Sequence, residues 1–95
     1  MNKKELVNKV SSRTDLSKKE IEDILTLVLE TIINSIAKGE KVTLVGFGSF
    51  RVKHTKARQA RNPKTGVQIL VPAKKIPTFS VGKFFRETVN NSQYL

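Results

Sequence analysis

The sequence predicts a small α+β protein in which helices come first, a basic β-hairpin follows and a short helix ends the fold. Three observations support this order. Apolar residues recur with a helical period up to Ile36, extended runs and turn residues dominate residues 41–71, and helical spacing returns after Ser80. With 95 residues, the chain is expected to form one domain spanning residues 1–95.

The N-terminal part is predicted to begin with a short amphipathic helix. It runs from about Lys3 to Ser12, and Leu6, Val7 and Val10 share one of its faces. No long apolar run accompanies it, so neither a secretory signal nor a membrane-spanning segment is expected.

A second, longer helix is indicated by its start signal, its period and its stop signal. In Ser17-Lys18-Lys19-Glu20 the Ser17 hydroxyl can accept the amide of Glu20, and Glu20 can reach back to the Ser17 amide. Gly39 is well placed to end the helix. Between these signals an apolar stripe extends over about four turns: Ile21, Ile24, Leu25, Val28, Leu29, Ile32, Ile33 and Ile36.

Strands and turns are predicted next. Lys41–Val45 is a short β-type run, and Gly46 and Gly48 on either side of a Phe predict a tight turn where backbones approach closely. Strand character resumes at Phe50. It runs into a segment whose turn residues predict a hairpin.

That hairpin is predicted to turn at Asn62–Gly66, where Pro63 presets the first corner and Gly66 can adopt a left-handed conformation. Val67, Ile69 and Val71 alternate along the returning strand. Pro72 and Pro77 cannot donate ladder hydrogen bonds, so this strand should be interrupted or lie at an edge.

The C-terminal segment is predicted to form a short helix. Ser80 is expected to cap it, Phe85 and Val89 are expected to face inward, and residues 90–95 are expected to fray.

The formal net charge of +10 is placed very unevenly. Residues 1–50 carry a net +1, residues 51–76 carry eight basic and no acidic side chains, and residues 77–95 carry a net +1. A merely solubilising surface would intersperse the two signs. Residues 51–76, called the arm from here on, therefore predict a polyanionic partner such as nucleic acid, an anionic membrane or an acidic protein.

The apolar residues predict a core shared between two copies. The arm takes 26 of the 95 residues, and the remaining 69 are near the lower limit for independent stability. This body still carries the long apolar helix face together with Phe47, Phe50 and Phe79. We infer that these surfaces form a dimer core, and a dimer supplies two arms that can embrace a duplex.

The arm lacks the aromatic rings that surfaces for single strands and RNA normally use for stacking. This favours phosphate contact and groove occupancy on duplex DNA. Arg58 and Arg61 lie near the tip, and a narrow minor groove attracts arginine. Pro63 at the tip is a rigid apolar wedge suited to enter a base step and kink the duplex.

Three segments of the chain resemble the histone-like HU/IHF family: Val45–Phe50, Ala60–Gly66 and Pro77–Lys83. The resemblance covers about residues 1–90. It implies an intertwined dimer with a helical base, a three-stranded antiparallel sheet in each subunit, two long β-ribbon arms and a short C-terminal helix. Members of this family are among the known minor-groove architectural proteins.

The same resemblance implies a non-enzymatic protein that bends and compacts duplex DNA with little sequence specificity, in a bacterial or alternatively a plastid nucleoid. It places Arg58, Arg61 and Pro63 in the minor groove. It assigns phosphate contacts to five further residues: Lys3, Lys53, Lys75, Lys83 and Arg86. Three arm residues complete the candidate DNA-binding set: Lys56, Asn62 and Lys64.

Two positions depart from the family's pattern. Thr55 stands where a basic residue is common, and Ala60 stands where glycine is common. The first puts one phosphate contact of the arm in question, although Lys56 is adjacent. The second is expected to stiffen the bend before the tip.

Two kinds of partner are expected. Duplex DNA is expected to be bound more tightly when it is bent, nicked or distorted. A second copy of the chain is expected to form a homodimer, and a heterodimer is left open.

Other function classes fit the sequence less well. RNA or ribosome binding is the alternative, because such proteins also use basic extensions. No nucleophile–base–orienter set or phosphate-cradling glycine loop is present, so catalytic residues, cofactors and small-molecule substrates are not expected. The chain has no cysteine, and His54 is its single histidine, so no metal site is expected. No predicted helix outside the inferred core combines a basic face with a large apolar face, which disfavours membrane binding.

Overall fold

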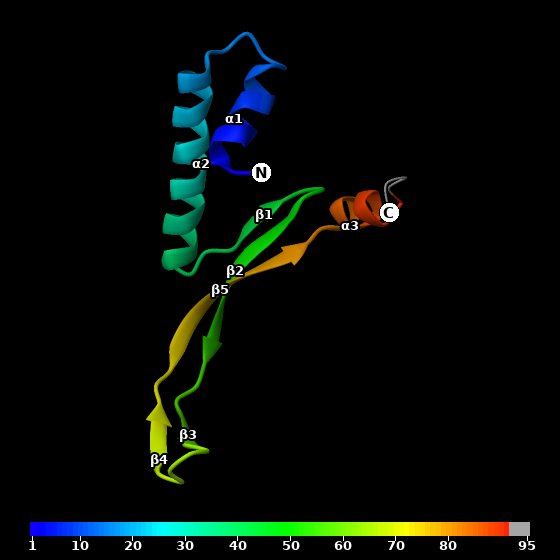
Figure 1. The fold of residues 1–95 in the computed structure, drawn as a ribbon. Coiled ribbons are helices and arrows are strands. Elements are labelled where there is room, and N and C mark those ends of the chain that lie inside the picture. Colours follow the sequence, from blue (N-terminus) through cyan, green and yellow to red (C-terminus); the bar gives the residue numbers. More distant parts are fainter. Residues whose placement is uncertain (92–95) are drawn as a thin grey trace. The chain divides into compact units, whose positions relative to one another are not determined.

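The computed structural model describes residues 1–91, and the chain divides into two compact units, Met1–Asn34 and Ser35–Leu95 (Figure 1). The elements follow in the order α1 (Lys3–Ser11), α2 (Lys18–Ala37), β1 (Val42–Leu44), β2 (Gly48–Thr55), β3 (Arg58–Arg61), β4 (Gln68–Val71), β5 (Lys74–Val81) and α3 (Lys83–Asn90). This confirms the α+β class with two N-terminal helices, a three-stranded antiparallel sheet, a β-ribbon arm and a short C-terminal helix. The single domain over residues 1–95 stays a prediction.

Both N-terminal helices begin at side-chain caps. The Asn2 side-chain oxygen accepts the backbone N–H of Glu5 at 2.9 Å and starts α1. Before α2, the Ser17 hydroxyl oxygen accepts the backbone N–H of Glu20 at 3.1 Å. The return bond of this capping box differs from the expected one, because the Glu20 carboxylate accepts the Ser17 hydroxyl, at 3.2 Å, rather than its amide.

Gly39, two residues beyond the end of α2, adopts a left-handed backbone conformation that favours glycine. Gly39 has a φ of 86°, and its N–H donates to the Ile36 carbonyl at 2.9 Å. The N–H of Glu40 reaches back to the Ser35 carbonyl, also at 2.9 Å. These two bonds form a Schellman motif, which confirms Gly39 as the predicted helix stop.

The first unit leaves much of its apolar surface uncovered. Val7 on α1 and Ile21 on α2 are buried, and an apolar hollow between these helices is lined by five further residues: Leu6, Val10, Ile24, Leu25 and Val28. Ile24 is 53% exposed and Ile33 is 64% exposed. One copy of this unit therefore does not bury its own apolar stripe.

The sheet of the second unit has the strand order β1-β2-β5, with antiparallel pairing throughout. Directly paired residues lie on the same face of a sheet. Val42, Phe50 and Phe79 form one row across the three strands on one face. Thr43, Ser49 and Ser80 form a row on the opposite face. One face of the sheet is thus apolar and the other is polar.

Four phenylalanines connect the apolar face to α3. The Phe79 ring centroid lies 4.8 Å from that of Phe50 and 5.4 Å from that of Phe47, and Phe47 lies 5.3 Å from Phe85. The N–H of Gly82 donates to the Phe47 carbonyl at 2.8 Å, which holds the start of α3 at the turn between β1 and β2. Phe47 and Phe79 nevertheless remain 46% and 40% exposed.

Two expectations for the C-terminal segment are wrong. Ser80 does not cap α3, because it lies inside β5 opposite Ser49, and the N-cap position is taken by Gly82, which makes no side-chain capping bond. Phe85 is half-buried against Phe47, but Val89 is 53% exposed rather than inward. The predicted fraying concerns residues 90–95, of which 92–95 lie outside the described residues.

The arm is a continuation of β2 and β5 into a second two-stranded ribbon, β3 paired with β4 (Figure 1). The β2–β5 ladder ends at the pair Thr55–Lys74, and Pro72 lies in the gap before it on the returning side. Pro77 lies in β5, an edge strand of the sheet. Both parts of the proline prediction, an interruption and an edge, are therefore confirmed.

Candidate nucleic-acid interface

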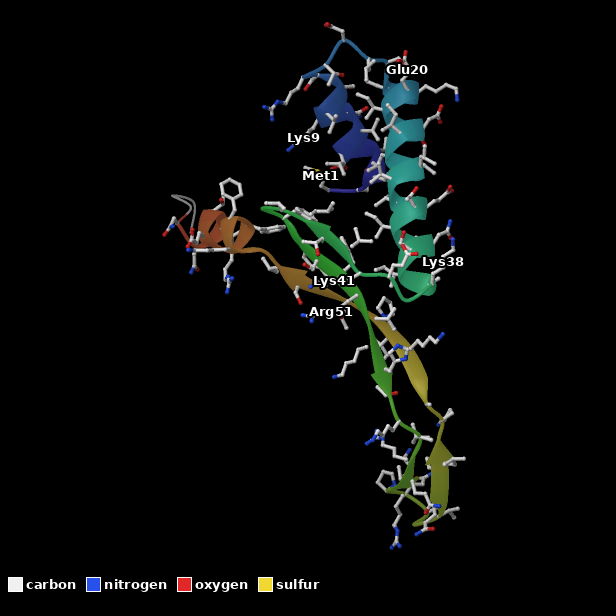
Figure 2. All side chains as sticks on the ribbon, turned by 180° about the vertical axis from the view of Figure 1, so that it is seen from behind. Met1, Lys9, Glu20, Lys38, Lys41 and Arg51 are labelled. Carbon is white, nitrogen blue, oxygen red and sulfur yellow. The ribbon has the colours of Figure 1, made fainter. Side chains whose placement is uncertain are left out.

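The two compact units carry very different charges. Met1–Asn34 contains six basic and six acidic residues, whereas Ser35–Leu95 contains twelve basic and two acidic residues. The whole net charge of +10 therefore belongs to the second unit, and nitrogen-tipped side chains project along its strands (Figure 2). The ion pairs found among residues 1–91 are Lys19–Asp23 and Lys83–Glu87, and neither involves the arm.

The tip of the arm is shaped by its own hydrogen bonds. The Asn62 N–H donates to the Val67 carbonyl at 2.9 Å, and the Gly66 N–H donates to the Asn62 carbonyl at 2.8 Å. The Asn62 side-chain oxygen also accepts the N–H of Lys64 at 2.9 Å. Gly66 has a φ of 72°, as the turn chemistry predicts. These bonds hold the exposed Pro63 at the first corner of the turn.

The two arginines near the tip lie on opposite faces of the ribbon. Arg58 pairs with Val71 and shares its face with Ala60, whereas Arg61 pairs with Gln68 on the other face. Both arginines are exposed. The ribbon therefore presents one guanidinium to each side, which suits a groove with a phosphate chain along each wall.

The remaining candidates lie on four different elements or loops. Lys53 is in β2, Lys56 is in the gap between β2 and β3, and Lys75 is in β5 opposite His54. Lys83 and Arg86 are in the first turns of α3, where Lys83 forms an exposed ion pair with Glu87 at 3.8 Å. These residues, like the tip, belong to the second unit.

Lys3 is the one candidate in the first unit. It is the first residue of α1, and its ammonium donates to the Thr26 hydroxyl on α2 at 2.6 Å. Because this partner is neutral, the positive charge of Lys3 is not compensated by it.

Thr55, one of the two positions that depart from the family's pattern, has a structural role. Its hydroxyl oxygen accepts the N–H of Lys74 at 3.1 Å and also lies 3.4 Å from the Lys74 carbonyl. The side chain thereby supplies hydrogen bonds where the β2–β5 ladder ends. Ala60 is half-buried and pairs with Ile69 in the β3–β4 ribbon.

Arg51 and the hydroxyl groups around it lie outside the candidate set that the sequence predicts. Arg51 belongs to the arm by sequence, yet it lies in β2 of the sheet (Figure 2). Its Nη2 donates to the Ser80 hydroxyl at 2.9 Å. The alternation Ser49, Arg51, Lys53 along the strand is the signal that places these side chains on one face. The sequence does not indicate their neighbour Ser80, because a serine before a helical pattern predicts a helix cap.

Two further classes of site are absent from residues 1–91. These residues contain no group of three or more histidine, cysteine, aspartate or glutamate side chains that could hold a metal ion. None of the helices in the same range has the length and apolar character needed to cross a bilayer.

The sequence of this chain matches a known protein family over almost its whole length. The model of the bacterial DNA-binding protein family matches residues 1–90. The chain belongs to this family. Among its relatives, the DNA-binding protein HU of Nostoc sp. is 52% identical over 89 residues, which cover 94% of this chain and 95% of the relative. The DNA-binding protein HU of Staphylococcus aureus is 49% identical over 89 residues, with 94% and 99% covered.

Solved structures of the bacterial DNA-binding protein family agree with this assignment. An Anabaena HU–DNA cocrystal structure matches with a TM-score of 0.86 at 50% identity, covering 97% of this chain and 100% of that one. HU from Thermotoga maritima matches with a TM-score of 0.68 at 38% identity, covering 94% and 98%. The resemblance to histone-like HU proteins inferred from three sequence segments is thus confirmed.

Proposed function

We propose that this chain is a non-enzymatic architectural protein that binds duplex DNA through its arm with little sequence specificity, bends it and compacts it in the bacterial nucleoid. The observation that carries the proposal is the separation of charge, since twelve basic and two acidic residues lie in the unit that contains the arm. Membership of the bacterial DNA-binding protein family and the similarity to an HU–DNA cocrystal structure support the same function.

The arm binds by neutralising phosphates and occupying the minor groove. Arg58 and Arg61 project from opposite faces of the ribbon, so each can approach one wall of the groove. Pro63 stands exposed at the turn and enters a base step, which kinks the duplex. Seven further residues take phosphate or groove contacts along the second unit: Lys53, Lys56, Asn62, Lys64, Lys75, Lys83 and Arg86. Lys3 adds a phosphate contact from α1.

The functional unit in this proposal is an intertwined homodimer. In each unit of the single chain, apolar side chains that a stable core would bury stay exposed, including Leu27 at 64%, Phe47 at 46% and Phe79 at 40%. A second copy covers such surfaces, and Phe47, Phe50 and Phe79 then form part of the shared core. Two arms follow from two copies, and together they hold both sides of a bent duplex.

Dimerisation predicts that thermal stability depends on protein concentration. A tenfold dilution should lower the midpoint of unfolding by roughly 3–6 °C, because only the folded state gains from association. Circular dichroism at several concentrations measures the shift, and sedimentation gives the mass. A folded monomer at micromolar concentration, with a constant midpoint, would contradict the shared core.

The proposed function is tested by comparing three ligands of equal length in one assay: duplex DNA, duplex RNA and single-stranded DNA. Duplex DNA should bind most tightly, and a nicked or pre-bent duplex should bind more tightly than the intact one, because part of the unstacking free energy is already supplied. Equal or tighter binding of RNA would instead support an RNA- or ribosome-binding protein.

A further inference from the structure

The polar face of the sheet carries an ordered group of hydrogen-bond donors away from the tip of the arm. Thr43, Ser49 and Ser80 form a row of hydroxyl groups across β1, β2 and β5, and the Ser49 hydroxyl lies 3.5 Å from that of Thr43. Arg51 lies in the next row, directly opposite Thr78. The Thr78 hydroxyl on β5 donates to the Arg51 carbonyl on β2 at 3.3 Å, which adds a side-chain hydrogen bond between the two strands in this row.

Arg51 is exposed, and its guanidinium has a defined hydrogen-bond partner on the sheet. Its Nη2 donates to the Ser80 hydroxyl, a diagonal neighbour on β5, at 2.9 Å. Long side chains can reach such a diagonal neighbour across a strand pair. The guanidinium is thereby drawn over the hydroxyl row instead of toward the tip of the arm, and its position is fixed by a half-buried serine.

The hydrogen bond between Arg51 and Ser80 leaves both side chains able to bind an anion. Serine is neutral, so Arg51 keeps its full charge, and a guanidinium with five N–H donors retains four after this bond. The Ser80 oxygen accepts one hydrogen bond and still has its own O–H to donate. Strands β1, β2 and β5 contain no aspartate or glutamate, so no carboxylate on the sheet competes for these donors.

We propose that this polar face is a phosphodiester-binding surface, on which Arg51 contacts a DNA phosphate and Ser80 is the positioning residue that orients its guanidinium. Arginine, serine and threonine side chains are regular partners of phosphate oxygens, and these contacts set the register of a protein on a duplex. Lys53 shares the face of Arg51 on β2, and Lys74 shares it on β5, so the surface continues toward the tip of the arm. The inference rests on the proposed binding of duplex DNA, which it extends to Arg51 and the hydroxyl row of the sheet.

The test is a double-mutant cycle with Arg51→Ala, Ser80→Ala and the double variant, measured on a linear duplex at several salt concentrations. Arg51→Ala should weaken binding about tenfold and make the slope of log K against log salt shallower by about one unit. Ser80→Ala should weaken binding about three- to fivefold with little change in the slope. In the Arg51→Ala background, the same serine substitution should have no further effect, because Ser80 acts through Arg51.

Two control variants test whether Arg51 acts through its planar guanidinium on the sheet rather than through its charge alone. Arg51→Lys keeps the charge and should keep the slope, yet it should lose affinity and its coupling to Ser80, because lysine lacks the planar fork. Arg13→Ala removes one charge from the first unit and should leave both affinity and slope close to those of the parent. Thermal midpoints of all variants show whether the fold is intact.

The outcomes are distinguishable from one another. If the parent binds DNA but Arg51→Ala binds equally well with the same slope, the sheet surface is wrong while the proposed function stands. If Ser80→Ala weakens binding equally with and without Arg51, Ser80 does not position the guanidinium. If the parent itself does not bind duplex DNA, the proposed function fails, and this inference fails with it.

Discussion

Raising the salt concentration from 50 to 200 mM should weaken binding to a linear duplex by about 10³- to 10⁵-fold. The reason is the release of counterions when the basic residues of the second unit replace them on the phosphates. If about six to ten phosphates are neutralised, log K should fall against log salt with a slope of roughly −5 to −9. Titrations at several salt concentrations, with duplexes of unrelated sequence, measure this slope and should give similar values for each duplex.

The slope should respond to individual charges of the arm. Arg61→Ala should make it shallower by about one unit and weaken binding to every duplex alike. Pro63→Ala is the matched control, because it changes the neighbouring tip without removing a charge and should leave the slope nearly unchanged. A parent slope close to zero, or a strong preference for one sequence among many, would exclude a mode of binding dominated by the DNA backbone.

Gly48→Ala should lower the free energy of unfolding by about 3 kcal/mol. Gly48 is buried in β2, and a Cβ there would collide with the backbone carbonyl of Ser80 and with the ring of Phe79. The carbonyl belongs to the β2–β5 ladder and cannot move without breaking it, so the sheet or the phenylalanine cluster must distort. Denaturant unfolding at fixed protein concentration measures the loss.

Gly39→Ala is the control for this substitution. A Cβ at Gly39 meets nothing within 4 Å, but the residue has a φ of 86°, so the cost is that of the left-handed backbone alone, about 1 kcal/mol. The loss at Gly48 should therefore be clearly larger. If both variants lose the same amount, the close approach of β2 to β5 at Gly48 is not as tight as the geometry indicates.

The helices could be predicted from the sequence because their signals are local. The cap at Ser17 and the stop at Gly39 each depend on residues within a few positions, and the apolar period between them fixes the type of element. Ser80 shows the limit of this reasoning. A serine before a helical pattern is a common cap, but here Ser80 pairs with Ser49, which is far away in the sequence, so β5 continues through Val81.

Some features of the candidate DNA-binding surface could likewise be predicted from local sequence signals, and others could not. The charge of the arm and the turn at Pro63 are visible in composition and turn chemistry alone. The bond between Arg51 and Ser80 depends on the register of β2 against β5, which no local pattern specifies. Thr55 is similar, because its hydroxyl finds its partner at Lys74 only once the two strands are aligned.

DNA bending is measured most directly by the distance between the two ends of a duplex, followed by energy transfer between end labels as the protein is added to saturation. The ends should approach each other with the parent protein, whereas Pro63→Ala should bind the duplex but bring the ends less close together. If the parent saturates the duplex and the distance between its ends does not change, the protein does not bend DNA.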